Sequence, residues 1–294
     1  MTDLFKNGID DFRLKCIALI CMIIDHMGEY LNLPLYFRYI GRLAAPIFIF
    51  CCVQGCLHTG NRKQYMLRLY IGACVMAVFD AWAGINVNFF RTLFSICVLI
   101  FVISEYKKTQ KKKIWVFYLL WQAGSSLLCY LVAINPWIDL EAFGAYLLPA
   151  LLGNVLFLEG GLFFVFIGIW FYYAGEDKVR LSVGYLLMVF IFIVGMQSNP
   201  YLTAIFVKAQ NILGDPVGPL VYGMFEDVIG QGFLCIGSYY YQSLSENYQW
   251  MMIGALPVLW LYNGEKGRSG KWFFYVFYPV HYILLYCIQT YVLS

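Results

Sequence analysis

The chain has 294 residues, of which 62% are apolar and only 13% are charged, and its mean hydropathy is +0.69. Soluble domains carry roughly 25% charged residues, so this composition excludes a soluble protein and indicates an integral membrane protein. The net charge of +3 comes with no basic face interleaved with aromatic residues, which gives no sign of nucleic-acid binding. No segment between the apolar runs can bury its own core, so we expect one polytopic domain over residues 1–294 in the lipid bilayer.

Apolar segments of about 20 residues, the length that crosses a bilayer as a helix, recur along the chain. Residues 143–174 fit either one tilted helix with a re-entrant turn or two short helices, so we expect an all-α bundle of 10 or 11 spans. Prolines bound residues 198–219, which predicts an interfacial helix or lid instead of a span. The other helices are expected near 13–31, 39–57, 65–84, 89–105, 114–134, 181–197, 217–240, 249–262 and 272–292.

Basic connections predict the orientation of the bundle. NRKQYMLR (61–68) and KKTQKKK (107–113) are rich in Lys and Arg, and the positive-inside rule places both in the cytoplasm. The N-terminus is then cytoplasmic, and the 29–38 turn and the acidic NPWIDLE loop (135–141) lie outside. NGEKGRSGK (263–271) is cytoplasmic only if residues 143–174 make two passes. The first apolar run lacks a cleavage site of small residues, so we interpret it as an uncleaved helix.

The ten cysteines all lie within apolar runs, where a cysteine acts as a small hydrophobic side chain. The sequence contains no CxxC pair and no His/Cys cluster with zinc spacing. We therefore expect structural cysteines and no metal.

CMIIDHMGEY (21–30) places Asp25, His26 and Glu29 in an otherwise apolar helix. An Asp at the centre of a membrane helix costs about 2.5–3.5 kcal/mol, so such residues face a cavity or a partner. Adjacent helix positions point about 100° apart, so Asp25 and His26 have separate roles. An ion pair between Asp25 and Arg42 at the start of the next helix would leave His26 as a base. The alternative is that these side chains only tie two helices together.

Two further groups of polar residues flank the apolar segments. His58 precedes a basic stretch at the cytoplasmic face, where arginines suit the phosphates of a nucleotide-containing donor; surface decoration is the alternative. Near the C-terminus, Asn263 and Gly264 form a turn pattern, and Pro279 kinks a final helix. His281 lies beyond that kink as a second titratable group at membrane depth, or as a satisfied polar contact within the bundle.

Motifs of soluble enzymes are absent from the sequence. It contains no GxSxG elbow, no HExxH, no GxxxxGK[ST] loop and no GxGxxG loop. Nothing in the sequence therefore supports a hydrolase, ATPase or dehydrogenase of the soluble type.

Three stretches together resemble the conserved blocks of the TraX family, whose founding member is linked to N-terminal acetylation of conjugative pilin. They are LKCIALICMIIDHMGEYL, RYIGRLAAPIFIFCCVQGCLHTGNRKQYMLRL and LYNGEKGRSGKWFFYVFYPVHYILL, covering residues 12–70 and 261–286. The middle of the chain departs from the family. VMAVFDAWAG retains only Asp80 where an SE-x-P-F-D-type motif is expected, and LEGGLFFVFIG (158–168) stands in for a DYG-type motif with Glu159 as its acid.

The TraX family is similar to a broader group of transmembrane acyltransferases that includes heparan glucosaminide acetyltransferases and polysaccharide O-acetyltransferases. The resemblance implies a bundle with a central cavity or tunnel in the bacterial cytoplasmic membrane. It also implies acetyl-CoA as cytoplasmic donor, and an outward-facing amine or hydroxyl, on a protein N-terminus or a glycan, as acceptor. Carried onto this sequence, the catalytic residues are His26, Asp25 and Arg42. The donor-binding residues are Arg38, His58, Arg62, Lys63, Arg68, Asn263, Gly264, Arg268 and His281.

Acyl transfer from a thioester needs a base for the acceptor, a site for the carbonyl oxygen, and alignment. His26 is the expected base, with Arg42 or Asn263 near the oxyanion; direct transfer and an acetyl-His26 intermediate both stay open. A non-catalytic membrane assembly protein is one alternative, and a homo-oligomer is left open. The other alternative is a proton-coupled transporter with a relay of Asp25, His26, Glu29 and His281.

Overall fold

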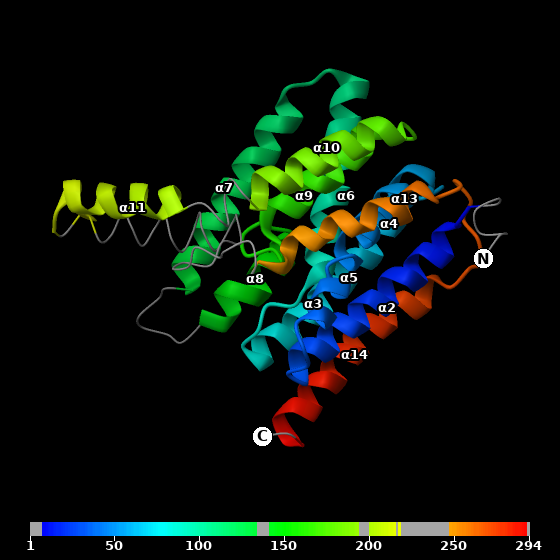
Figure 1. Cartoon of the computed structure of the whole chain (residues 1–294). Coiled ribbons are helices and arrows are strands. Elements are labelled where there is room, and N and C mark those ends of the chain that lie inside the picture. The colour runs from blue at the N-terminus through cyan, green and yellow to red at the C-terminus, as the bar shows by residue number, and fades with distance from the viewer. Residues whose placement is uncertain (1–7, 134–140, 194–199, 216, 219–246, 293–294) are drawn as a thin grey trace.

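The computed structural model describes residues 8–133, 141–193, 200–215, 217–218 and 247–292 (Figure 1). These residues form helices and connections, with no strand in the described ranges, which confirms the expected all-α class. The first half contains α2 (Asp11–Tyr30), α3 (Tyr36–Gly41), α4 (Ala44–His58), α5 (Arg62–Ala83), α6 (Phe89–Thr109) and α7 (Lys113–Ala133). The remainder contains η1 (Phe143–Leu147), α8 (Leu148–Leu152), α9 (Gly161–Ala174), α10 (Lys178–Phe190), α11 (Pro200–Leu213), η4 (Tyr248–Gly254), α13 (Ala255–Trp260) and α14 (Lys271–Tyr291).

Helix starts are set by short polar side chains at the N-cap. The side chains of Asp10, Asn61, Asn88 and Asp177 each accept a hydrogen bond from the backbone N–H three residues on, which would otherwise have no partner. α5 ends at Gly84, whose φ of 68° is the left-handed conformation that glycine adopts readily. These caps fix where the apolar segments enter and leave the bundle.

Five described helices are long and apolar enough to cross a membrane, so the chain is an integral membrane protein. They are Tyr36–His58, Arg62–Ala83, Phe89–Thr109, Lys113–Ala133 and Trp272–Tyr291. The expected total of 10 or 11 spans stays a prediction, because α9 and α10 are shorter and residues 219–240 of the expected 217–240 helix lie outside the described residues. Residues 248–260 differ from the expected helix at 249–262: they form a 3₁₀ segment of 7 residues and an α-helix of 6, too short to span.

Residues 143–174 form two short helical segments instead of one continuous helix. η1 and α8 run over Phe143–Leu152, and a loop over 153–160 leads into α9. Gly153 and Gly160 bound that loop with φ of 61° and 73°, a conformation that stops a helix. The loop is important because it carries Glu159 into the bundle.

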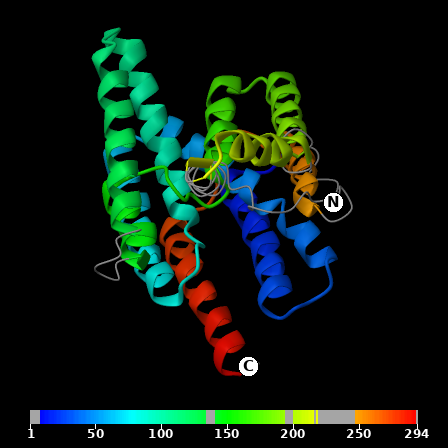
Figure 2. The same ribbon diagram turned by 90° about the vertical axis from the view of Figure 1, so that its left-hand side faces the viewer.

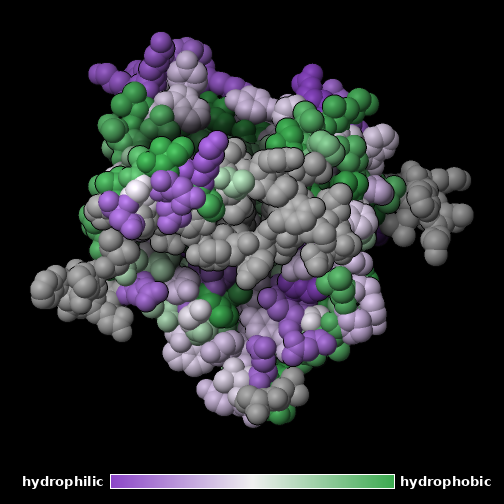
Figure 3. All heavy atoms as spheres, turned by 60° about the vertical axis from the view of Figure 1, so that its left-hand side comes forward, coloured by the Kyte–Doolittle hydropathy of each residue, from purple (hydrophilic) through white to green (hydrophobic). Residues whose placement is uncertain are grey.

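The N-terminal segment and the 261–270 connection lie at the same end of the molecule. The backbone N–H of Ile9 donates to the Leu261 carbonyl over 2.6 Å, and the N–H of Asn263 donates to the Ile9 carbonyl over 3.1 Å. This is the end at which the basic α4–α5 and α6–α7 connections also lie (Figure 1). At the top of the view in Figure 3, hydrophilic residues lie above a band of hydrophobic residues.

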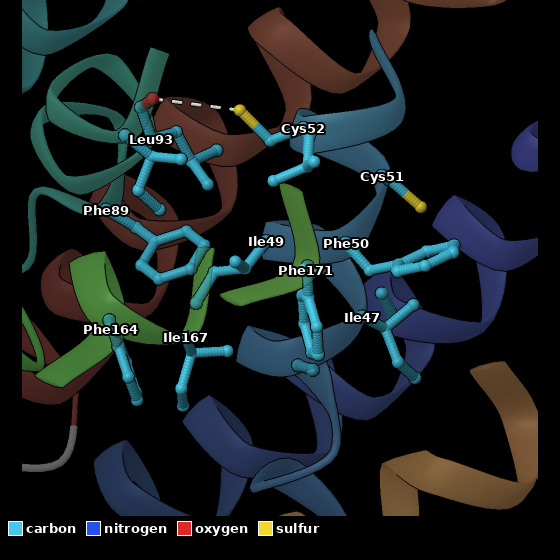
Figure 4. Close-up of a cluster of buried hydrophobic side chains, with 14 of the residues drawn as sticks. Ile47, Ile49, Phe50, Cys51, Cys52, Phe89, Leu93, Phe164, Ile167 and Phe171 are labelled. Atoms are coloured by element: carbon cyan, nitrogen blue, oxygen red, sulfur yellow. Dashed lines mark hydrogen bonds between the residues drawn. The ribbon is translucent and has the colours of Figure 1, made fainter. Parts of the chain in front are cut away.

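The core is centred on α4, which packs between α2, α6 and α9. Ile47 and Ile49 are fully buried, and Figure 4 shows the α4 side chains meeting Ile167 and Phe171 of α9. Along the bundle, α14 lies beside α2 (Figures 1 and 2). This pairing joins residues from the two ends of the chain.

One pair of cysteines differs from the expected small hydrophobic role. Cys56 of α4 and Cys97 of α6 form a disulfide, with Cα atoms 6.4 Å apart. The bond joins residues 41 positions apart, so it depends on how α4 packs against α6 and leaves no local pattern in the sequence.

Candidate functional site

Two histidines and a tyrosine form a buried hydrogen-bonded cluster between α2 and α14. His26 Nδ1 lies 2.8 Å from His281 Nε2, and the Tyr282 hydroxyl lies 2.7 Å from His26 Nε2. The two imidazole rings are stacked with centroids 5.0 Å apart. His26, His281 and Tyr282 are only 6%, 7% and 3% exposed. His281, expected among the donor-binding residues, is therefore in direct contact with the expected base.

The helix backbone fixes the direction of these hydrogen bonds. His281 Nδ1 lies 3.1 Å from the Phe277 carbonyl, which can only accept, so Nδ1 carries the proton. In the neutral pair His281 Nε2 then accepts, and His26 Nδ1 donates to it. His26 Nε2 consequently bears a lone pair, which accepts the hydrogen bond of the Tyr282 hydroxyl. His281 thus orients His26 as a base whose reactive nitrogen is Nε2.

Asp25 pairs with arginines instead of with His26, as helical geometry predicts. Its carboxylate forms an ion pair with Arg42 and lies 3.2 Å from Arg38 Nη1. Arg38 also reaches Glu29 over 2.6 Å, on the same face of α2 as Asp25. Gly41 makes this approach possible, because a Cβ there would overlap the Asp25 side chain. The predicted Asp25–Arg42 pair is present.

A small pocket of about 60 Å³ connects the histidine cluster to the ion pair. Arg42 Nε is buried without a hydrogen-bond partner among the described residues, although Arg42 Nη1 lies 3.4 Å from the Gln249 side-chain oxygen. The pocket is therefore lined both by His26 and by Arg42, whose Nε–H has no partner among the described residues. Its lining includes Met22, Asp25, His26, Arg42, Phe48, Phe89, Glu159, Gln249, Tyr278 and Tyr282.

The 153–160 loop brings Glu159 to this pocket and is fastened by Arg91 of α6. Arg91 donates to the backbone carbonyls of residues 154, 156 and 157 over 3.4, 2.6 and 3.3 Å. Thr92 donates to the Glu159 carbonyl over 2.8 Å, and the Tyr278 hydroxyl lies 3.3 Å from Glu159 Oε2. These hydrogen bonds pair several backbone carbonyls of the loop inside the bundle.

Arg91→Lys should lower the free energy of unfolding by on the order of 3 kcal/mol, because Lys cannot reach three carbonyls at once and buried acceptors lose their partners. Thermal unfolding of the purified protein in detergent measures the change. Arg180→Lys is the matched control, since the Arg180 side chain is 60% exposed and pairs with Asp177 about one helical turn away. Equal stability of the two variants would contradict the fastening role.

The Glu159 carboxyl lies outside the candidate membrane spans. Burial raises the pKa of Glu159 from its usual 4.5 to about 8, and the nearby charge of Asp80 adds to the effect. The folded state therefore holds this proton more tightly than the unfolded chain does. The resulting stability is complete below pH 4.5 and is lost as the pH rises toward 8.

Glu159→Gln should remove this pH dependence, because the amide resembles the protonated acid and does not titrate. Melting temperatures of wild type and variant, measured from pH 5 to 9, should diverge with rising pH, and wild type should become the less stable of the two. Parallel profiles across this range would contradict a protonated Glu159.

A second pocket, of about 120 Å³, adjoins the first along α2. Both pockets are lined by Met22, Phe48, Phe89 and Tyr278, so they share a wall. The second pocket adds Lys15 and Arg68, and Arg68 Nε is also buried without a partner among the described residues. Lys15 precedes His26 by 11 positions, roughly 16 Å along a helix. The pockets follow one another along α2, and a continuous tunnel stays a prediction.

The remaining predicted donor residues lie elsewhere. His58, Arg62 and Lys63 are exposed around the α4–α5 connection, and His58 hydrogen-bonds the Gln54 carbonyl of its own helix. Asn263, Gly264 and Arg268 are exposed in the 261–270 connection. Asn263 pairs with Ile9 before the start of α2, roughly 25 Å along the helix from His26, which places it away from the expected oxyanion site. Its side chain instead accepts from the Glu265 N–H in a turn.

Sequence reasoning missed several residues that line the two pockets. Tyr282 and Tyr278 come from an aromatic-rich final helix in which nothing distinguishes them from other tyrosines. Their spacing from His281 is the available signal: Tyr278 lies three positions before it and Tyr282 directly after it. Lys15, at the start of the first apolar run, also lines the larger pocket.

The family model described as TraX protein matches residues 12–135 of the chain. This part of the chain is similar to the TraX family. This TraX region contains Lys15, His26, Arg42 and Arg68, whereas the α14 residues of the cluster and Glu159 lie C-terminal to it. The first two blocks of the resemblance fall within the matched region, and the third block, over 261–286, falls outside it.

The comparison with curated proteins gives a relative described as "Probable fimbrial assembly protein FimC, serogroup H1" of Dichelobacter nodosus. It is 33% identical over 76 residues, which cover 24% of this chain and 31% of the relative. The match thus spans less than a third of the length of that protein. No solved structure matches the chain.

Proposed function

We propose that the protein is a membrane acyltransferase that moves an acetyl group from acetyl-CoA to an acceptor on the opposite face of the membrane. The observation that carries the proposal is the placement of His26 Nε2. It is an imidazole lone pair, oriented by His281, in a buried pocket that is also lined by Arg42, whose Nε–H has no partner among the residues that the structure describes.

In this proposal the donor enters through the larger pocket. Arg68 and Lys15, which also pairs with Asp11 over 2.5 Å, offer positive charge at its far end, where the anionic part of the donor would bind. The apolar walls that both pockets share suit the thin pantetheine arm, which would carry the thioester toward His26. The adenosine of the donor would stay outside the pocket.

The reaction then needs one base and one oxyanion partner. The acceptor amine or hydroxyl displaces the Tyr282 hydroxyl at His26 Nε2 and loses its proton to that nitrogen as it attacks the thioester carbon. The negative charge that develops on the carbonyl oxygen is stabilised by Arg42 Nε–H. The carbon–sulfur bond breaks, and the leaving CoA thiolate takes the proton from His26, which returns the site to its starting state.

Binding and turnover of acetyl-CoA by the purified protein test this proposal. Wild type in detergent should bind acetyl-CoA and release free CoA when an acceptor is supplied in a membrane extract. Lys15→Gln with Arg68→Gln should raise the apparent KM for acetyl-CoA by about 10²- to 10⁴-fold with a smaller change in kcat, because each of the two lost charge-assisted hydrogen bonds contributes about 1.5–3 kcal/mol. Arg62→Gln is the control, because Arg62 is exposed at the start of α5, the helix that also carries Arg68. No binding at millimolar acetyl-CoA would reject the donor.

A second candidate is a non-catalytic role in assembly, which the description of the fimbrial relative favours. The requirement for His26 distinguishes a transferase from a non-catalytic assembly protein. A transferase loses its function when His26 becomes Gln, whereas an assembly protein with an intact fold keeps it. A pilus component would also be a reasonable first acceptor to supply, because the TraX family is linked to pilin acetylation.

A further inference from the structure

Three cysteines meet at the contact between α4 and α6. Cys52 and Cys56 are four positions apart and therefore lie on one face of α4. Cys97 of α6 faces them, with its sulfur 3.5 Å from that of Cys52. All three sulfurs lie within 4.8 Å of one another, and all three residues are buried. Figure 4 shows Cys52 directed at α6 and Cys51 directed away from it.

The acyl transfer proposed above uses none of these sulfurs. The proposed mechanism runs between Lys15 and His26 along α2, whereas the sulfurs lie between α4 and α6. Cys52 alone among them lines the larger pocket, which it shares with the cations Lys15 and Arg68. The proposed acyl transfer therefore does not explain why these three cysteines lie together.

The sulfur positions suit a three-coordinate soft metal ion. A metal–sulfur bond of about 2.3 Å in a planar triangle places the sulfurs about 4 Å apart, which lies within the span of this cluster. Zinc sites in proteins generally take four ligands, and the described residues add no fourth His, Cys, Asp or Glu to the group. Thiolate ligands suit soft ions such as Cu(I) as well as zinc and iron–sulfur clusters, and three ligands leave the usual four-coordinate zinc and cluster sites incomplete. The two cations beside Cys52 would offset the negative charge of the bound thiolates.

We propose that Cys52, Cys56 and Cys97 bind one Cu(I) ion through their three sulfurs when the Cys56–Cys97 disulfide is reduced. Reduction takes two electrons and two protons from a dithiol reductant and yields the two thiols. Binding of Cu(I) then displaces the thiol protons, because the thiolate is the ligand. The disulfide and the metal are alternative states of one cluster, and the oxidised form excludes the metal.

Anaerobic titration of the reduced full-length protein in detergent with Cu(I), against a chromogenic Cu(I) chelator, tests the site. We expect one tightly held Cu(I) per chain, with X-ray absorption showing sulfur neighbours only and a coordination number of three. Cys52→Ser, Cys56→Ser and Cys97→Ser should each weaken binding at least 100-fold. Cys51→Ser, a buried neighbour directed away from the cluster, should bind as wild type does.

A second measurement uses only the wild-type protein, so its result does not depend on whether the cysteine variants fold. Oxidation with diamide should release the bound Cu(I) and remove two titratable thiols, and reduction should restore both binding and thiols. The proposal is overturned if the reduced protein fails to compete with the chelator, if Cys51→Ser loses binding as the cluster variants do, or if Zn(II) is retained in preference to Cu(I). These readouts do not depend on acetyl transfer.

Discussion

His26→Gln should lower acetyl transfer by roughly 10²- to 10⁴-fold, the range that a general base contributes. The Gln amide occupies a volume similar to that of the imidazole and can still hydrogen-bond His281 or Tyr282, but it cannot take a proton from the acceptor. Transfer from radiolabelled acetyl-CoA, measured with the purified variant under single-turnover conditions, gives the effect on the chemical step.

Two further variants make this result specific. His281→Gln should also reduce the rate, because His26 loses the partner that fixes which nitrogen bears the lone pair. His58→Gln should leave the rate unchanged, since His58 is exposed at the end of α4. Full activity in His26→Gln, with His58→Gln equally active, would show that His26 is not the base of the proposed reaction.

Asp25→Asn should produce the largest loss of stability, about 3–5 kcal/mol, because it leaves the Arg42 and Arg38 guanidinium groups without their buried counter-charge. Asp25 is 6% exposed, so water does not compensate for the missing carboxylate. The thermal unfolding midpoint in detergent measures this loss.

The double variant Asp25→Asn with Arg42→Gln separates the ion pair from other effects. Because the two side chains contact each other directly, the losses should be strongly non-additive, and the double variant should be more stable than the sum of the single changes predicts. Additive losses would mean that Asp25 and Arg42 act independently. Glu29→Gln is the control, since its side chain is 55% exposed and should change stability by less than about 1 kcal/mol.

The sequence predicted the parts of the fold that depend on local pattern. Helix 13–31 is observed at Asp11–Tyr30 and helix 65–84 at Arg62–Ala83, because long apolar runs in lipid have few alternatives to a helix. The expected helix at 249–262 is broken because Pro257 lacks an N–H for the bond to residue 253, so the segment begins as a 3₁₀ helix.

The sequence predicted only those contacts of the candidate site that join residues close together in the chain. The Asp25–Arg42 pair follows from a short connection between neighbouring helices. The contact between His26 and His281 joins residues 255 positions apart, and no spacing rule reveals that α14 packs against α2. The position of the Glu159 loop could not be predicted either. It depends on hydrogen bonds that Arg91 donates to backbone carbonyls, and such contacts leave no pattern in the sequence.

In the proposed function, this cluster transfers acetyl groups across the membrane from acetyl-CoA. Inverted membrane vesicles containing the protein, given radiolabelled acetyl-CoA in the outer medium, test it most directly. We predict that label accumulates on acceptors sealed within the vesicle lumen, that its accumulation requires His26, and that the CoA product stays outside. Label confined to the outer surface, or equal labelling of the lumen in the His26→Gln variant, would contradict the account.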